Sequence, residues 1–231
     1  MIRFLFFALL VILGLFAWLA WRGDLVVPPE WNPWAPLDIQ AEPNLLTPFK
    51  LRKVRGDPGL CRAALLTSDF DFVPAPDRSS DTGCGVSNAV EVTESMLKFN
   101  APFTATCPVA VALAMTERHV ILPAAREILG TEVTALDHFG TYSCRNINHS
   151  ASRRRSQHAT ANAIDIAAFR MADGRMISLT SGWDGDTDAS RFLRRVRDGA
   201  CRFFKVVLSP DYNAAHRDHF HFDMGPYSTC R

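Results

Sequence analysis

Three of the seven histidines in this 231-residue chain lie in one short stretch near its C-terminus, HRDHFHFDMG, which starts at His216. If HFHF is a β-strand, His219 and His221 project from one face and the phenylalanines from the other, because side chains alternate along a strand. The segment then offers two imidazoles on one face and an apolar surface on the other. This suits a metal ligand beside an acid–base group, although a polar edge strand would show the same alternation.

A second segment, SQHATANAIDIAAF, contains His158 and, seven residues later, Asp165. In a strand, Ile164 and Ile166 share one face and Asp165 takes the other. A buried carboxylate needs a cationic partner or a metal ion. The alternative to a metal is therefore a salt bridge to one of the arginines at positions 153–155.

His158, Asp165 and His221 are ligand types that zinc accepts, and three protein ligands leave a fourth position for water, as in catalytic zinc sites. Structural zinc sites usually fill all four positions with protein groups, and cysteine-rich ones contain C-x-x-C pairs, which this chain lacks. The two segments together therefore predict a catalytic zinc centre.

The pattern S-x-H-x(6)-D followed by a distant H-x-H resembles the zinc peptidase group of lysostaphin, the D-alanyl-D-alanine carboxypeptidases and hedgehog. HRDHFHF resembles the end of the penicillin-insensitive murein endopeptidases, and SQHATANAIDIAAF resembles the bacterial extensin-like C-terminal domain. The resemblance covers roughly residues 51–231. It implies zinc held by His158, Asp165 and His221, with His219 as general base and peptidoglycan peptides as substrate. One departure is that residues 159–162 lack the glycine that often follows the first histidine in these peptidases.

Two residues before His221 could act as the base, Asp218 and His219. In a regular strand a residue two positions away shares the ligand's face and one three positions away does not, which favours His219. Arg145 is a candidate for binding a peptide carboxylate, or for a structural ion pair. His216 is expected to line the cleft or to hydrogen-bond and orient a ligand, and not to be a ligand itself.

The N-terminus is apolar and uncharged from Phe4 to Trp21, long enough to cross the hydrocarbon core of a bilayer. Trp18 stands where a small residue would precede a cleavage site at Ala20, and Trp21 and Arg22 suit a membrane interface. We therefore expect an uncleaved anchor in the inner membrane, the alternative being a removed signal peptide.

Six widely spaced cysteines follow the anchor. An even set favours disulfides in an oxidising compartment over free thiols, so the C-terminal part is expected in the periplasm. The sequence leaves the pairing open among Cys61, Cys84, Cys107, Cys144, Cys201 and Cys230.

The sequence divides into an anchor at 1–23, a proline-rich tether at 24–50 and one domain at 51–231. The formal net charge of +1 makes nucleic acid an unexpected partner. Helical segments, such as 107–130 with a kink or division at Pro123, alternate with strands and a hairpin turning at Asp173 and Gly174. This order predicts an α+β domain with a largely antiparallel central sheet, flanking helices and disulfides.

The expected function is that of a membrane-anchored periplasmic zinc hydrolase that cleaves peptide bonds of peptidoglycan, with peptidoglycan peptides as its partners. A noncatalytic zinc-containing module that binds the cell wall, or acts as a scaffold, would need the same ligands and is the alternative.

Overall fold

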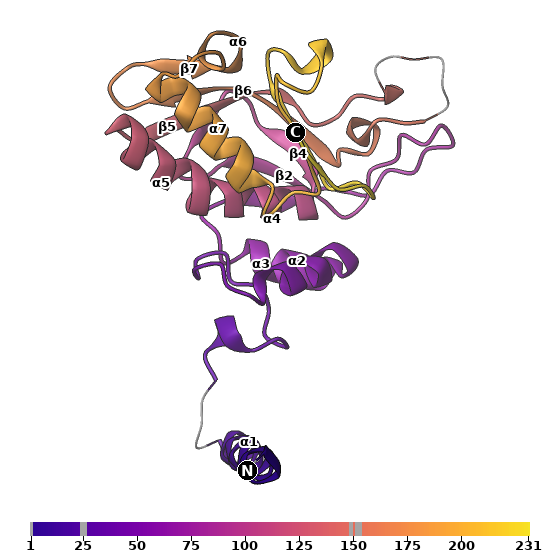
Figure 1. Ribbon diagram of the computed structural model, residues 1–231. Helices are drawn as coiled ribbons and strands as arrows, with labels where there is room; N and C mark the ends of the chain where they lie inside the picture. The colour runs from indigo at the N-terminus through magenta and orange to yellow at the C-terminus, as the bar shows by residue number, and fades with distance from the viewer. Residues whose placement is uncertain (1, 24–26, 148–149, 151–153) are drawn as a thin grey trace.

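The computed structural model describes residues 2–23, 27–147, 150 and 154–231, and it contains an N-terminal helix followed by an α+β domain (Figure 1). The N-terminal helix α1 (Ile2–Arg22) is long and apolar enough to cross a membrane, and none of its span is buried against the domain. The predicted apolar helix is thus present.

The central sheet has the strand order β10-β8-β9-β6-β5-β3, with β7 paired to β6. Among the described strands of this sheet, only the pairs β10·β8 and β3·β5 are parallel, which confirms the predicted, largely antiparallel sheet. A smaller antiparallel sheet has the order β1-β2-β4. The bounds are β1 (Asp71–Pro74), β2 (Ala89–Glu94), β3 (Lys98–Phe99), β4 (Phe103–Thr106), β5 (Val133–Gly140), β6 (Ala163–Met171), β7 (Met176–Ser178), β8 (Val206–Leu208), β9 (Phe220–Asp223) and β10 (Thr229–Cys230).

The helices α4, α5 and α7 lie together on one side of the central sheet (Figure 1). α4 (Cys107–Thr116) starts with Pro108 in its first turn, where a missing N–H costs nothing. The helical path then continues through η2 (Glu117–Ile121), α5 (Leu122–Ala124) and η3 (Ala125–Leu129), so the stretch around Pro123 is divided, as expected, with π-helical turns on both sides. α7 (Asp188–Ala200) begins at a capping box between Thr187 and Ser190.

The apolar faces of the two site-bearing strands form the core beneath these helices. Phe220 and Phe222 of β9 are fully buried, with stacked rings 5.4 Å apart between centroids. On β6, Ile164 and Ile166 are fully buried as well. The predicted alternation is therefore confirmed on both strands, and the opposite face is left to polar side chains.

The six cysteines form three disulfides, Cys61–Cys107, Cys84–Cys144 and Cys201–Cys230. The first joins α3 (Pro58–Leu65) to the start of α4, and the last joins the end of α7 to β10. The prediction that all six cysteines are disulfide-bonded is confirmed. The pairing depends on tertiary contacts that cysteine spacing does not encode.

The proline-rich segment is not a free tether along its whole length. Leu37 and Ile39 are 5% and 1% exposed and belong to the domain's core. The ammonium group of Lys50 on α2 (Thr47–Gly56) donates to the carbonyl of Pro29 at 2.6 Å. The boundary predicted between residues 50 and 51 falls inside α2, which spans Thr47–Gly56. Lys50 and Lys53 of this helix also bond to carbonyls of the proline-rich segment.

Glu117, in η2, is a buried carboxyl group away from the polar strand face. Its Oε2 accepts a hydrogen bond from Ser95 Oγ at 2.8 Å, and the residue is 1% exposed. Burial raises the pKa of Glu117 to about 7, and the hydrogen bond from Ser95 only partly offsets this effect. The folded state therefore binds this proton more tightly than the unfolded chain does.

We predict that Glu117 makes the protein less stable as pH rises from about 4.5 to 7, by at most about 3 kcal/mol. The stabilisation that comes from the raised pKa of Glu117 is fully present below the pKa of the unfolded chain. It is lost as the pH rises through the pKa of the folded state. Glu117→Gln, which keeps an acceptor for Ser95, should remove this pH dependence and melt at a higher temperature than wild type at pH 8. Thermal melts between pH 4.5 and 8 test this, with the exposed Glu94→Gln as control. Parallel curves for wild type and Glu117→Gln would contradict it.

Candidate metal centre

The central sheet places the predicted ligands side by side. Strands β6 and β9 are antiparallel, and their register pairs Asp165 directly with His221. His158 reaches the same point from η5 (Gln157–Thr160), a short helix that leads into β6 and is capped by the Ser156 side chain. Three residues from two distant parts of the sequence thus meet on the polar face of the sheet.

The ligand atoms of these residues form a small triangle. His158 Nε2 lies 3.1 Å from Asp165 Oδ2 and 3.1 Å from His221 Nδ1, and His221 Nδ1 lies 2.9 Å from Asp165 Oδ1. Zinc bonds of roughly 2.0–2.1 Å in a tetrahedron place neighbouring ligand atoms about 3.3 Å apart. Each measured pair is therefore close to the spacing that zinc requires. The two histidines meet different oxygens of Asp165, and one ligand atom from each of the three residues lies within 4.8 Å of the others. The N, N, O donor set suits zinc.

Hydrogen bonds to the far side of each ring orient the two histidines. His158 Nδ1–H donates to the backbone carbonyl of Thr141 at 3.1 Å, so Nε2 is the ring nitrogen that faces the cluster. His221 Nε2–H donates to Asp223 Oδ2 at 3.0 Å, which leaves Nδ1 facing the cluster. Such partners fix the tautomer and the ring orientation of metal-binding histidines.

The electrostatics of the cluster are those of a buried anion among imidazoles. Burial by itself would raise the pKa of Asp165, but hydrogen bonds from His158 and His221 outweigh it and hold that pKa well below its usual range. Burial would lower the pKa of His221, whereas its hydrogen bonds to Asp165 and Asp223 outweigh burial and raise it. The site therefore holds a carboxylate that is ready to bind a cation.

His219 lies beside the triangle and not within it. Its Nε2 is 3.6 Å from Asp165 Oδ1, and its Nδ1–H donates to Asp218 Oδ1 at 2.8 Å. In the neutral ring Nε2 is then the nitrogen that can accept a proton, and it faces the cluster. Asp218 is exposed and accepts this bond from the turn before β9. The strand begins at Phe220, so the alternation expected for a strand starting at His219 does not extend to His219 and Asp218.

The cluster opens into a cleft of about 670 Å³. His216, His219 and His221 line it together with Arg145, so the cleft gathers every site residue predicted from the sequence except His158 and Asp165. His216 Nδ1 pairs with Asn213 Oδ1 at 2.8 Å, and its ring centroid is 5.7 Å from that of His221. His216 thus lies next to the ligands without joining them. The cleft wall also includes Arg154, Arg155, Tyr212 and Tyr227.

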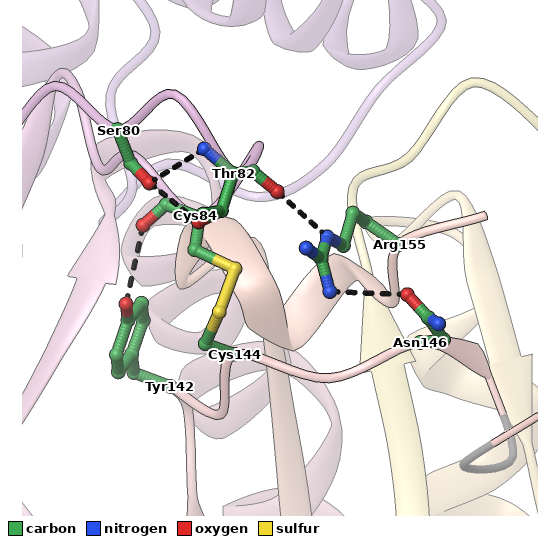
Figure 2. Close-up of a disulfide and its surroundings, with 7 residues drawn as sticks. All are labelled: Ser80, Thr82, Cys84, Tyr142, Cys144, Asn146 and Arg155. Atoms are coloured by element: carbon green, nitrogen blue, oxygen red, sulfur yellow. Dashed lines mark hydrogen bonds between the residues drawn. A yellow bond between two sulfur atoms is a disulfide. The ribbon is translucent and has the colours of Figure 1, made fainter. Parts of the chain in front are cut away.

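The segment that carries Arg145 is fastened to the loop before β2 (Figure 2). The Cys84–Cys144 disulfide makes one tie, and Tyr142 Oη donates to the Cys84 carbonyl at 3.1 Å. Arg155 makes another, because its Nε donates to the Thr82 carbonyl at 2.8 Å and one of its terminal nitrogens donates to Asn146 Oδ1 at 3.1 Å. Arg155 is therefore a brace of the cleft wall. It is not the partner of Asp165 that the alternative interpretation required, and Arg153 lies outside the described residues.

The turn after His158 has the backbone form for which glycine is the usual residue. Ala161 has φ +54°, in the left-handed region, and is fully buried. Its N–H donates to the His158 carbonyl at 3.2 Å, and its own carbonyl accepts from Thr106 N at 2.9 Å. These bonds hold the turn in place of the glycine missing from residues 159–162.

Two groups that matter here were not anticipated from the sequence. Asp223 follows His221 by two residues in the same strand, so the alternation that placed His219 could also have placed it. The carbonyl of Thr141 has no such signal, because it reaches His158 only through the chain path between β5 and η5.

The chain matches the family described as "Extensin-like protein C-terminus" over residues 59–231. No curated protein and no solved structure shows a significant match. The matched range includes every residue of the triangle, the histidine beside it and the cleft wall. Because the match covers well over half of the sequence, this chain belongs to the extensin-like protein C-terminus family.

Proposed function

We propose that this protein is a membrane-anchored, zinc-dependent hydrolase acting on peptide bonds of peptidoglycan. The observation that carries the proposal is the triangle of His158 Nε2, Asp165 and His221 Nδ1 beside a cleft, with the free nitrogen of His219 turned toward it. A noncatalytic metal site would have no use for a positioned base next to its ligands.

Zinc bound by these three residues would act as a Lewis acid and lower the pKa of a coordinated water to roughly 7. Side chains of the protein would accept the proton and stabilise the charge that results. His219 Nε2 would accept the proton of the attacking water, and Asp218 would stabilise the imidazolium through its hydrogen bond to Nδ1–H. His216 would remain neutral at neutral pH, because burial and the neighbouring His221 and His219 lower its pKa to about 4.

The resemblance to murein peptidases and the residues of the cleft support the proposed substrate class. Arg145 lines the cleft that the ligands share, and a guanidinium group matches a carboxylate with two parallel hydrogen bonds. Tyr212 and Tyr227 add flat apolar surface on the same cleft. A stem peptide with a free carboxylate fits this combination.

The three disulfides favour the oxidising periplasm, with α1 as the anchor in the inner membrane.

We predict that the full chain, purified in detergent, carries about one zinc ion and that a chelator lowers its melting temperature, because a ligand of the folded state alone stabilises it. Metal analysis and thermal melts with and without chelator test this. His221→Ala should lose the zinc, since it removes one of three protein ligands. A metal-free protein whose melting is unaffected by chelator would refute the centre.

Asp223→Ala should weaken zinc binding about 10- to 100-fold, because the His221 ring loses the group that orients it. Asp223→Asn should lose less, since its amide oxygen can still accept from His221 Nε2–H. Competition with a chromogenic zinc chelator measures both affinities. The exposed Asp184→Asn, in the loop after α6 (Leu179–Gly182), is the matched control. Equal affinities in wild type and Asp223→Ala would show that Asp223 does not support the ligand.

His219→Ala should keep its zinc and lose on the order of 10² to 10⁴ in the rate of fragment release from purified peptidoglycan, the usual effect of an acid–base group. Asp218→Asn should lose much less, because an amide oxygen can still accept from His219 Nδ1–H. Near-wild-type turnover in His219→Ala would reject this base, and a larger loss in Asp218→Asn would assign the role to the carboxylate. Zinc without any released fragment in the wild type would favour the scaffold function.

A further inference from the structure

A group of exposed apolar side chains lies where the proline-rich segment meets α2. We call it the tryptophan patch, and it consists of Trp31, Trp34, Leu45 and Phe49. Their exposed fractions are 53%, 82%, 89% and 39%, in that order. Tryptophans this exposed are unusual on a surface that only water contacts.

Hydrogen bonds tie together the stretches of chain that carry these side chains. Lys53 Nζ donates to the carbonyl of Pro33, next to Trp34, at 3.4 Å, and it also lies 5.7 Å from the centre of the Phe49 ring. Asn44 Nδ2 donates to the carbonyl of Glu30 at 3.0 Å, which joins the neighbours of Leu45 and Trp31. The stretches that carry the four apolar side chains are therefore fixed to one another.

Basic groups border the patch. The guanidinium carbon of Arg52 lies 5.6 Å from the centre of the Phe49 ring, and Lys53 lies on the same ring. Arg55 follows on the same helix. Glu30 precedes Trp31 in the packed segment. Its negative charge favours the protonated form of Lys50, although burial lowers the pKa of that lysine overall. Residues 27–57 carry basic and acidic side chains in equal number, and the basic Arg52 and Lys53 are the ones beside the Phe49 ring of the patch.

Chain length sets how far this patch lies from the end of α1. That helix ends at Arg22, and the packed part of the domain begins at η1 (Pro29–Trp31) after Val27. Five residue steps from Arg22 to Val27 span at most about 17 Å even when fully extended. A domain tied this closely to a membrane-spanning helix must keep residues 27–34 near the bilayer surface.

We propose that the tryptophan patch lies on the membrane surface beside α1 and inserts its aromatic rings at the headgroup level, with Arg52 and Lys53 on anionic lipid headgroups. Tryptophan prefers this interface, and basic side chains there are attracted to anionic lipids. The inference rests on the proposed anchoring by α1 but not on the proposed hydrolase activity. In this proposal the packed proline-rich segment contacts the bilayer surface, and this contact fixes the orientation of the domain relative to the membrane.

The test uses the full chain in vesicles of phosphatidylcholine with phosphatidylglycerol. Trp34→Phe allows the emission of Trp34 to be obtained as a difference from wild type. Trp34 should be quenched by lipids brominated near the carbonyl end of the acyl chain, and it should be several-fold less accessible to aqueous acrylamide than a free tryptophan derivative. The double variant Arg52→Glu, Lys53→Glu should lose much of this protection, whereas Arg217→Glu, in the loop before β9, should keep it.

Flotation of the vesicles tests the anchoring by α1 separately from the membrane contact of the tryptophan patch. Chains that float with the vesicles but whose Trp34 is open to acrylamide and unaffected by brominated lipid would overturn the membrane contact while leaving the anchor intact. Chains that do not float, or that have lost α1, would overturn both. Neither result bears on zinc content or fragment release, so the proposed hydrolase stands or falls separately.

Discussion

The burial of one carboxylate determines how the rest of this domain is arranged. Asp165 is 8% exposed on a strand whose other face lies in the core, and a charge in that position is costly unless cationic or hydrogen-bonding partners surround it. His221 meets it across the β6·β9 register, and His158 meets it from η5. The phenylalanines and isoleucines on the opposite face keep both strands flat against the helices. The same alternation that builds the core therefore holds the three donors within 4.8 Å of one another.

The supports of this cluster come from parts of the chain that contribute no ligand. The turn that presents His158 is bonded through Ala161 to Thr106, at the junction of β4 and α4. The cleft wall is tied by the Cys84–Cys144 disulfide and by Arg155 to the loop before β2. The small three-stranded sheet, which holds no candidate ligand, thus positions one side of the site. A change in that sheet would reach the site through these ties.

Local patterns carried the predictions that were confirmed, because the alternation in HFHF and AIDIAAF needs no knowledge of distant contacts. The same rule extends to Asp223, which lies two residues after His221 in the same strand. Other features depend on the tertiary approach of segments: the three cysteine pairs, the Thr141 carbonyl, and the packing of Leu37 and Ile39. Composition correctly indicated an irregular proline-rich segment. It could not show that Lys50 and Lys53 of α2 would satisfy carbonyls of that segment and so draw it onto the domain.

This packing changes what the anchor implies. A free tether of residues 24–50 would let the domain search a wide volume above the membrane, since the reach of a flexible chain grows with its length. With the segment from Pro29 onward fixed to α2 and α3, the stretch between α1 and the domain is only a few residues long. In a chain anchored through α1 as proposed, the cleft would lie within about one domain diameter of the bilayer. The proposed hydrolase, held in this way, would meet only the peptidoglycan closest to the membrane, so the packing of the proline-rich segment would restrict the proposed substrate as well as the position of the domain.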